Sequence, residues 1–340
     1  MNISIIIPTK NRSKYLFKLL NYYQSINFTG QLIIIDSSDK KIFIENKKFI
    51  ESNINLNIKY DFKDVNELIA RRYALKYIEK DYTVQSGDDD YYDPVGMQKI
   101  IDFLNKNEDY CCASGNTYAV SYDLEKNLVQ GISKYNTQAS NKSNALERLK
   151  DLNLENTPVI DFSIYRSEIF KKILNNTLDN ERANLFFKRI FNEYTFRIYS
   201  FLYGKCISLD IFYLVRLRVK ENNLIASQKI RDIYQNNKKE FFLSYFLLLR
   251  KIFQMLEQSK VFDKEVYLLC KKKIKRTILI RINPSFYMFV KKKLRFLYEI
   301  FKRLFYRIFT NELNYNNLSY TKSKNFNQEL KNIVEFINKN

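Results

Sequence analysis

The first 120 residues alternate between continuous apolar runs and segments whose apolar side chains recur at helical spacing. Uninterrupted β-branched runs are typical of strands buried on both faces of a parallel sheet. Strands are predicted over residues 3–8, 31–38, 81–87 and 110–120, and the alternating residues 56–62 predict a shorter one. Helices are predicted between them over residues 9–26, 65–80 and 94–107, with room for another between the second and third strands. This order predicts an α/β fold with a mostly parallel sheet flanked by helices.

The pattern changes twice further along the chain. Residues 140–225 mix the two periods, with helices predicted over 143–152 and 182–205, a strand followed by a helix over 158–174, and one or two strands over 206–219. From about residue 226 the pattern is helical, with lysine and aromatic residues throughout. We therefore expect an α/β domain of residues 1–225, a basic helical region of residues 226–310 and a polar tail of residues 311–340.

Polar groups fall at the carboxyl ends of three predicted strands: Pro8 and Thr9, then Asp36, then Asp88 to Asp90. Ligands of open α/β sheets bind at such strand ends, so these residues are expected to share one edge. The acidic stretch "QSGDDDYYDP" (85–94) is the most unusual of them, because adjacent like charges repel. An acidic triplet alone is more often a solvated turn. Its place at a strand end favours a site for Mg²⁺ or Mn²⁺, which prefer oxygen ligands and substrate phosphates.

The chain is strongly basic, with a formal net charge of +20. Residues 271–309 contain 13 lysine and arginine residues and one acid, Glu299. Within this stretch apolar residues recur at helical steps at Val290, Leu294, Leu297, Phe301, Leu304 and Ile308. Such a basic amphipathic helix is expected to lie on an anionic membrane surface. The alternatives are a helix packed on the α/β domain with a solvated basic face, and basicity produced by the codon bias of an AT-rich genome.

Residue usage excludes other chemistry. The chain has no histidine, and its four cysteines form no CxxC pair, so an imidazole base is excluded and a zinc site is disfavoured. The N-terminal residues do not read as a signal peptide, and no apolar run is long enough to span a bilayer. We expect a cytoplasmic protein that associates peripherally with the inner face of the plasma membrane.

Three motifs together resemble the family-2-like inverting glycosyltransferases of the GT-A fold, of the bacterial cell-surface glycan type. They are "SIIIPTKNR" (4–12), "IIIDSSD" (33–39) and "ELIARRYALKYIEKDYTVQSGDDDYYDP" (67–94), and the resemblance extends over about residues 2–223. It implies a nucleotide-sugar donor, bound mainly by residues 1–115, and a glycan or lipid-linked acceptor, bound mainly by residues 116–225. It also implies inversion and a role in lipopolysaccharide, capsule or other surface-glycan synthesis.

The resemblance also implies roles for individual residues of the donor half. Asp89 matches the metal ligand, Asp88 matches a ribose or second metal contact, and Asp90 supports them; Gly87 stands where the first aspartate of the usual DxD motif lies. Contacts with the base and ribose are implied for Pro8, Thr9 and Asp36, and a contact with the base or diphosphate is implied for Arg71.

The acceptor half must supply a base, because a sugar hydroxyl loses its proton as the new bond forms. The segment "NEYTFRIYSFLYGK" (192–205) is similar to the helix that carries this base in the family, which implies Glu193, with Asp161 as runner-up. Lys220 stands where the family has a metal-side histidine, and a lysine there can pair with the diphosphate.

Two other interpretations stay open. A basic nucleic-acid-binding protein would also explain the charge, although none of the usual nucleic-acid motifs is present and no nucleic-acid partner is expected. A catalytically degenerate GT-A protein would explain the departures at Lys10, Gly87 and Lys220.

Overall fold

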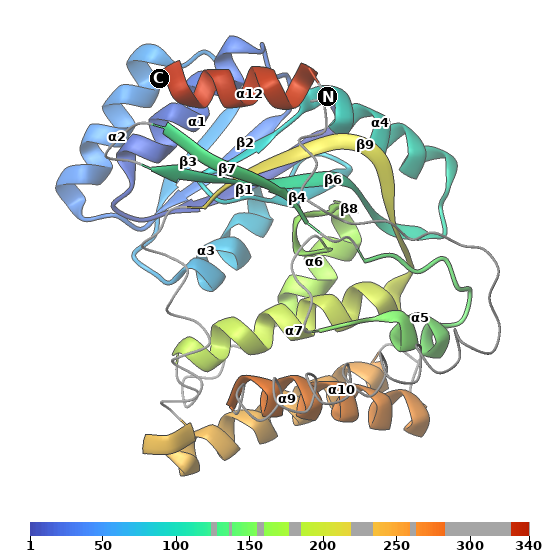
Figure 1. The fold of residues 1–340 in the computed structure, drawn as a ribbon. Coiled ribbons are helices and arrows are strands. Elements are labelled where there is room, and N and C mark those ends of the chain that lie inside the picture. Colours follow the sequence, from blue (N-terminus) through green and yellow to red (C-terminus); the bar gives the residue numbers. More distant parts are fainter. Residues whose placement is uncertain are drawn as a thin grey trace, which may run out of the picture.

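The computed structural model describes residues 1–123, 128–135, 138–154, 160–176, 185–218, 234–258, 263–282 and 328–339. One mixed sheet of nine strands forms its centre (Figure 1). The strands are β1 (Ile3–Thr9), β2 (Gln31–Asp36), β3 (Ile58–Phe62), β4 (Tyr82–Gln85), β5 (Asp90–Tyr92), β6 (Tyr110–Asp123), β7 (Leu128–Lys134), β8 (Ile164–Arg166) and β9 (Lys205–Arg218). Their order is β3-β2-β1-β4-β8-β6-β9-β5, and β7 pairs with β6.

The first half of the sheet is parallel, as the apolar runs predict. β1 pairs with β2 and β4, and β2 pairs with β3, all in the parallel sense. The isoleucine-rich centres of β1 and β2 are fully buried because helices cover both faces. The register sets Thr9 opposite Asp36, so both strands end at the same edge. The predicted convergence of polar strand ends is therefore present for these two residues.

The second half of the sheet is mixed, which the prediction of a mostly parallel sheet did not include. β8 lies antiparallel between β4 and β6, and β5 pairs antiparallel with β9. The short β5 begins at Asp90 and sets this residue opposite Arg216. β5 has three residues, too few for an alternating pattern to show, and the sequence indicated a loop at this place.

Helices cover both faces of the sheet (Figure 1). They are α1 (Ser13–Ser25), α2 (Lys40–Asn53), α3 (Glu67–Ala74), α4 (Pro94–Lys106), α5 (Ala145–Asp151), α6 (Ser167–Asn175), α7 (Leu185–Tyr203), α9 (Lys238–Gln258), α10 (Lys264–Ile282) and α12 (Gln328–Lys339), with 3-10 turns η1 (Leu75–Tyr77) and η2 (Ile160–Phe162). Buried residues of α1, α2, α4 and α12 form one hydrophobic core, and those of α3, α6, α7, α9 and α10 belong to the other.

Three cysteines meet where α7 ends: Cys111, Cys112 and Cys206. The thiol of Cys111 donates to the Ser200 carbonyl at 3.1 Å, and the Cys206 thiol lies 3.6 Å from the same oxygen. Arg148 is also buried here and donates to the carbonyls of Phe201 and Leu202. The last carbonyls of a helix have no partner within the helix, so these side chains complete its C-terminal end.

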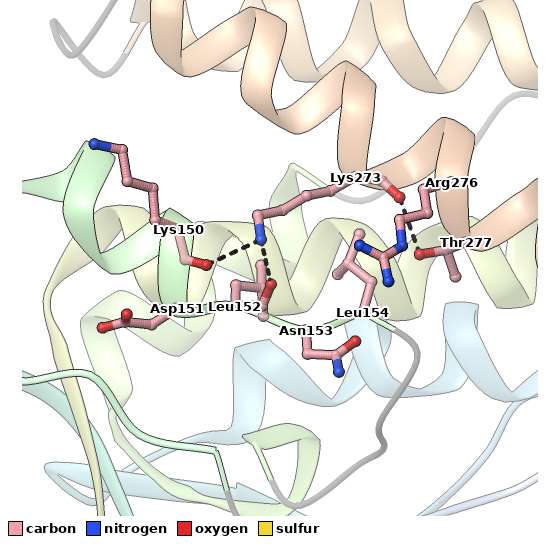
Figure 2. A pocket seen from close by; sticks show the side chains of 8 residues that line it. All are labelled: Lys150, Asp151, Leu152, Asn153, Leu154, Lys273, Arg276 and Thr277. Atoms are coloured by element: carbon pink, nitrogen blue, oxygen red, sulfur yellow. Dashed lines mark hydrogen bonds between the residues drawn. The ribbon is translucent and has the colours of Figure 1, made fainter. Parts of the chain in front are cut away.

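The C-terminal helices pack on the α/β domain. α9 lies against α7, and α10 lies against α5 and α9, on the side away from the sheet (Figure 1). Figure 2 shows how α10 is attached: Lys273 donates to the Leu152 carbonyl at 2.6 Å and to the Lys150 carbonyl at 3.2 Å. A cavity of about 230 Å³ lies beside these contacts, lined also by Arg276 and Thr277. Buried residues of α9 and α10 share one core with those of α7.

The end of the chain differs from the polar, loosely ordered tail that the sequence indicated. Residues 328–339 form α12, whose Ile333 and Ile337 are buried in the core beside β9 and β7. Lys18 of α1 donates to the Ile337 carbonyl at 2.6 Å. The apolar residues of "IVEFI" (333–337) have helical spacing and indicate an amphipathic helix, but the polar residues before them obscured this pattern. The amphipathic stretch of residues 283–309 and Lys220 lie outside the described residues.

Candidate active site

The acidic turn, defined as Asp88, Asp89 and Asp90, connects the end of β4 to β5. Asp88 is buried, and its carboxylate accepts a hydrogen bond of 2.8 Å from the Thr9 hydroxyl at the end of β1. Arg12 follows β1 and reaches the same place: its Nε lies 3.0 Å from Asp88, and its Nη2 lies 2.5 Å from Asp89. The structure therefore brings Thr9 and the acidic turn together.

Asp90 is held separately from its two neighbours. Its Oδ1 lies 2.8 Å from the Nε of Arg216 on β9, and its Oδ2 accepts a hydrogen bond of 2.9 Å from the Gly87 backbone. Arg216 also lies over the Phe162 ring, 3.8 Å from its centroid. Because Asp90 is directed into this pair and is buried, its position fits the supporting role that the resemblance implies.

Burial makes the other two carboxylates difficult to ionise. It raises the pKa of Asp88 to about 7, with a further contribution from the Asp89 charge, although Arg12 and Thr9 act in the opposite direction. Burial and the Asp90 charge also raise the pKa of Asp89. Two adjacent carboxylates, one buried and one partly buried, whose ionisation is disfavoured would be stabilised by a cation. The residues present thus fit Mg²⁺ or Mn²⁺ held by Asp88 and Asp89.

Asp36 lies at the end of β2 but is fully buried. Its carboxylate accepts hydrogen bonds from the Ser38 backbone at 2.8 Å, from Asn46 at 2.8 Å and from the Tyr60 hydroxyl at 2.5 Å. The predicted contact with a base or ribose would require one of these bonds to be exchanged. In this structure Asp36 orders the turn after β2, which Asn11 joins to the turn after β1 by accepting a hydrogen bond from Asp39.

The remaining donor-side residues are placed as follows. Pro8 lies on β1 opposite Ile35, one residue before the strand end. Arg71 lies on α3 and forms its ion pair with Glu67, one turn earlier, at 2.5 Å. The predicted contact of Arg71 with the base or diphosphate stays a prediction.

The two candidate bases lie on either side of one buried arginine. Asp161 in η2 is bound in a bidentate manner by Arg197, with contacts of 2.6 Å to Oδ2 and 3.2 Å to Oδ1. Glu193 lies one turn before Arg197 on α7, 3.7 Å away, and its side chain is 38% exposed whereas that of Asp161 is 8% exposed. The structure therefore distinguishes a buried carboxylate engaged by arginine from a solvent-accessible one beside it.

Short contacts connect this pair of carboxylates to the acidic turn. Gln85, the last residue of β4, donates to the Asp161 backbone carbonyl at 2.6 Å. The next residue of η2, Phe162, packs under Arg216, which pairs with Asp90. The turn that carries Asp161 thus lies next to the end of β4 and to the Asp90–Arg216 pair.

Three arginines pair with the carboxylates of this region, and the sequence did not indicate these pairs: Arg12, Arg197 and Arg216. Arg12 stands in "SIIIPTKNR" (4–12), and its partner Asp88 is 76 residues away. Arg216 stands in "VRLRVKENNLIA" (215–226), and its partner Asp90 is 126 residues away. No spacing rule predicts pairs so distant in sequence. Arg12 and Arg216 share one feature, a position within three residues of a strand end, whereas Arg197 lies within α7.

Comparison with known proteins identifies the class to which this arrangement belongs. Residues 4–174 match the family model of glycosyl transferase family 2. Since this match covers half of the chain, the protein belongs to glycosyl transferase family 2 and is a glycosyltransferase. The GT-A type of α/β fold expected from the motifs is thereby confirmed. No curated protein sequence matches the chain.

Among solved structures, the chain is similar to S. aureus TarS. TarS 1–349 has 17% sequence identity and a TM-score of 0.46, covering 84% of this chain and 83% of that chain. Its complex with UDP has 17% identity and a TM-score of 0.45, covering 76% of this chain and 72% of that chain. The complex with UDP-GlcNAc has 17% identity and a TM-score of 0.46, covering 76% and 73%.

Proposed function

We propose that the protein transfers a sugar, with inversion, from a nucleotide-sugar donor to an acceptor hydroxyl in the synthesis of a surface glycan. The family match supplies the class of reaction. The observation that carries the site is the Thr9–Asp88 hydrogen bond, because it joins the strand end expected to bind the nucleoside to the acidic turn.

Asp88 and Asp89 are proposed to hold Mg²⁺ or Mn²⁺, with Asp90 fixed behind them by Arg216. The chemistry that such an ion supplies when bound is positive charge beside the departing diphosphate. Thr9 keeps the Asp88 carboxylate oriented, and Pro8 and Thr9 form the strand end that would lie beside the nucleoside. Lys220 remains a proposed diphosphate contact.

Glu193 is the better candidate for the base. A general base must reach the acceptor hydroxyl, and Glu193 is solvent-accessible whereas Asp161 is buried and engaged by Arg197. In the proposed reaction the carboxylate of Glu193 takes the acceptor proton as the acceptor oxygen attacks the anomeric carbon. Arg197 is held by Asp161 and lies 3.7 Å from the Glu193 carboxylate, which supports a position of Glu193 beside this pair.

The test is a screen of nucleotide sugars by thermal shift with Mn²⁺, followed by turnover of any donor that binds. Asp89→Ala should abolish metal-dependent turnover and donor stabilisation, while the unfolding temperature without ligands stays close to that of the wild type. Lys59→Ala, on the edge strand β3, is the matched control and should change neither. Wild-type activity in Asp89→Ala would overturn the metal assignment.

We further propose that an anionic membrane surface is a partner, through α9 and α10. Large apolar side chains are exposed on the outer sides of these helices: Phe242, Leu243 and Phe246 on α9, and Leu268 and Leu279 on α10. Exposed cations flank them: Lys238, Lys239 and Arg250 on α9, and Lys271, Lys272, Lys275 and Arg276 on α10. Apolar residues surrounded by lysine and arginine suit an interface that offers both acyl chains and anionic headgroups. In the part of the chain that the structure describes, no helix is long and apolar enough to cross a bilayer.

The membrane proposal is tested by co-sedimentation with phosphatidylglycerol vesicles. Phe242→Ser combined with Phe246→Ser should lower the bound fraction strongly, and Ile44→Ser, an equally exposed apolar residue on α2, should not. Deletion of the C-terminal region is unsuitable as a test, because it would remove α12 from the core. Equal binding by the double variant and the wild type would overturn this proposal.

A further inference from the structure

The acidic turn already has a cation of its own. The Arg12 guanidinium contacts one oxygen of Asp88 at 3.0 Å and one oxygen of Asp89 at 2.5 Å. It also lies over the ring of Tyr15, 4.2 Å from the centroid, which supports its position from behind. A single positive group thus bridges the two carboxylates that are proposed to hold the metal ion.

Arg12 is well placed for this role and is not a chance surface contact. Its backbone carbonyl accepts the first hydrogen bonds of α1, from Tyr15 and Leu16, so the start of the helix fixes the base of the side chain. Its side chain is 29% exposed, and those of Asp88 and Asp89 are 5% and 16% exposed. A partly buried ion pair is screened little by water, so its charge acts strongly on any second cation nearby.

Arg12 and a divalent ion cannot both make their best contacts with Asp88 and Asp89. A divalent ion held by Asp88 and Asp89 would compete with the Arg12 guanidinium, which contacts both carboxylates. The bonds to Arg12 would have to be given up, and the two positive groups would repel each other. The same guanidinium, once displaced, would be free to bind phosphate oxygens in a bidentate manner.

We propose that Arg12 is a positioning residue that neutralises the acidic turn in the free enzyme, competes with the divalent ion for Asp88 and Asp89, and moves to the donor diphosphate when metal and donor bind together. This rests on the proposed function. Arg12 therefore weakens binding of the metal ion alone and strengthens binding of the complete metal–donor pair. The enzyme would in this way bind its metal mainly together with the donor.

The experiment measures Mn²⁺ binding by the loss of the free-ion electron paramagnetic resonance signal, at pH 8. Arg12→Gln should bind Mn²⁺ alone about tenfold more tightly than the wild type, an order-of-magnitude expectation for removal of one nearby charge. With UDP, as a representative nucleoside diphosphate, or with the diphosphate of the best donor from the screen, the advantage should disappear or reverse. Lys10→Gln removes an equal charge from the same loop, but Lys10 pairs with the exposed Asp64, so Mn²⁺ affinity should stay unchanged.

The outcomes separate this inference from the proposed function. Equal or weaker Mn²⁺ binding by a folded Arg12→Gln protein would overturn the competition, while metal-dependent turnover by the wild type would leave the proposed function standing. Absence of Mn²⁺ binding in both proteins, together with turnover in EDTA, would overturn the role of Arg12 and the metal assignment but not sugar transfer. Arg12→Lys keeps the charge without the bidentate geometry and should bind Mn²⁺ with an affinity between those of the wild type and Arg12→Gln.

Discussion

In both the acidic turn and the Asp161–Arg197 pair, arginine side chains offset the charge of buried carboxylates, but they do so to different extents. In each, an arginine holds one buried carboxylate and a more exposed carboxylate lies beside it: Asp90 with Arg216 and Asp161 with Arg197. At Asp161 the arginine makes several short contacts to one carboxylate. In the acidic turn Arg12 is divided between Asp88 and Asp89, and both keep a raised pKa.

This difference indicates which carboxylates serve the scaffold and which serve chemistry. A carboxylate saturated by a buried arginine has little capacity left for a ligand, and removing its partner is costly. Carboxylates that share one arginine are not saturated by it, so a metal ion can take its place. The four predictions that follow test this distinction.

The largest effect is expected at the candidate base. Glu193→Gln removes the proton acceptor and should lower turnover by about 10²- to 10⁴-fold, with little change in the unfolding temperature because the side chain is partly exposed. Turnover and thermal unfolding of the same preparation measure both. Asp161→Asn should instead lower the unfolding temperature and change turnover less. Full turnover in Glu193→Gln and none in a folded Asp161→Asn protein would exchange the two roles.

The second effect concerns the scaffold itself. Arg197→Met leaves the buried carboxylate of Asp161 without its cation and should lower the free energy of unfolding by about 3 to 5 kcal/mol. Urea unfolding measures this change. The double variant Arg197→Met, Asp161→Leu removes both charges and should recover part of the loss. A loss below about 1 kcal/mol in the single variant would show that solvent reaches this pair.

How far the sequence could predict this arrangement depends on the range of the interactions. β1, β2 and β4 were predictable because each is a local apolar run, and their shared edge followed from parallel topology. β7 pairs with β6 outside the main strand order, and no pattern in its sequence indicated it. The arginine partners of the carboxylates were not predictable, because residues 12 and 88 meet through the fold and not through spacing. For Asp36 the sequence placed the residue correctly at the edge, but burial and three hydrogen bonds could not be foreseen.

The third prediction concerns pH. The folded-state pKa of Asp88, about 7, lies above its ordinary value of 3.8, so the folded protein binds this proton more tightly. The resulting stability is present below about pH 4 and is lost as the pH rises through 7, by at most about 4 kcal/mol. Asp88→Asn should remove this dependence. Urea unfolding of both proteins at pH 4, 6 and 8, in EDTA, should give curves that diverge with pH; parallel curves would contradict the raised pKa.

The smallest effect is expected at Gly87, where the family has an aspartate. A Cβ built at Gly87 would lie 2.7 Å from an oxygen of Asp89 and 3.0 Å from an oxygen of Asp90. Rotation of Asp89 would break its contact with Arg12, and Asp90 is fixed by Arg216 and by the Gly87 backbone. Gly87→Ala should therefore cost about 1 kcal/mol in unfolding free energy, measured in urea. Gly87→Asp should cost more, because it adds a fourth carboxylate to a turn with two arginines. A stabilised Gly87→Ala protein would show instead that the turn has room for a side chain and that the entropy of the unfolded chain dominates.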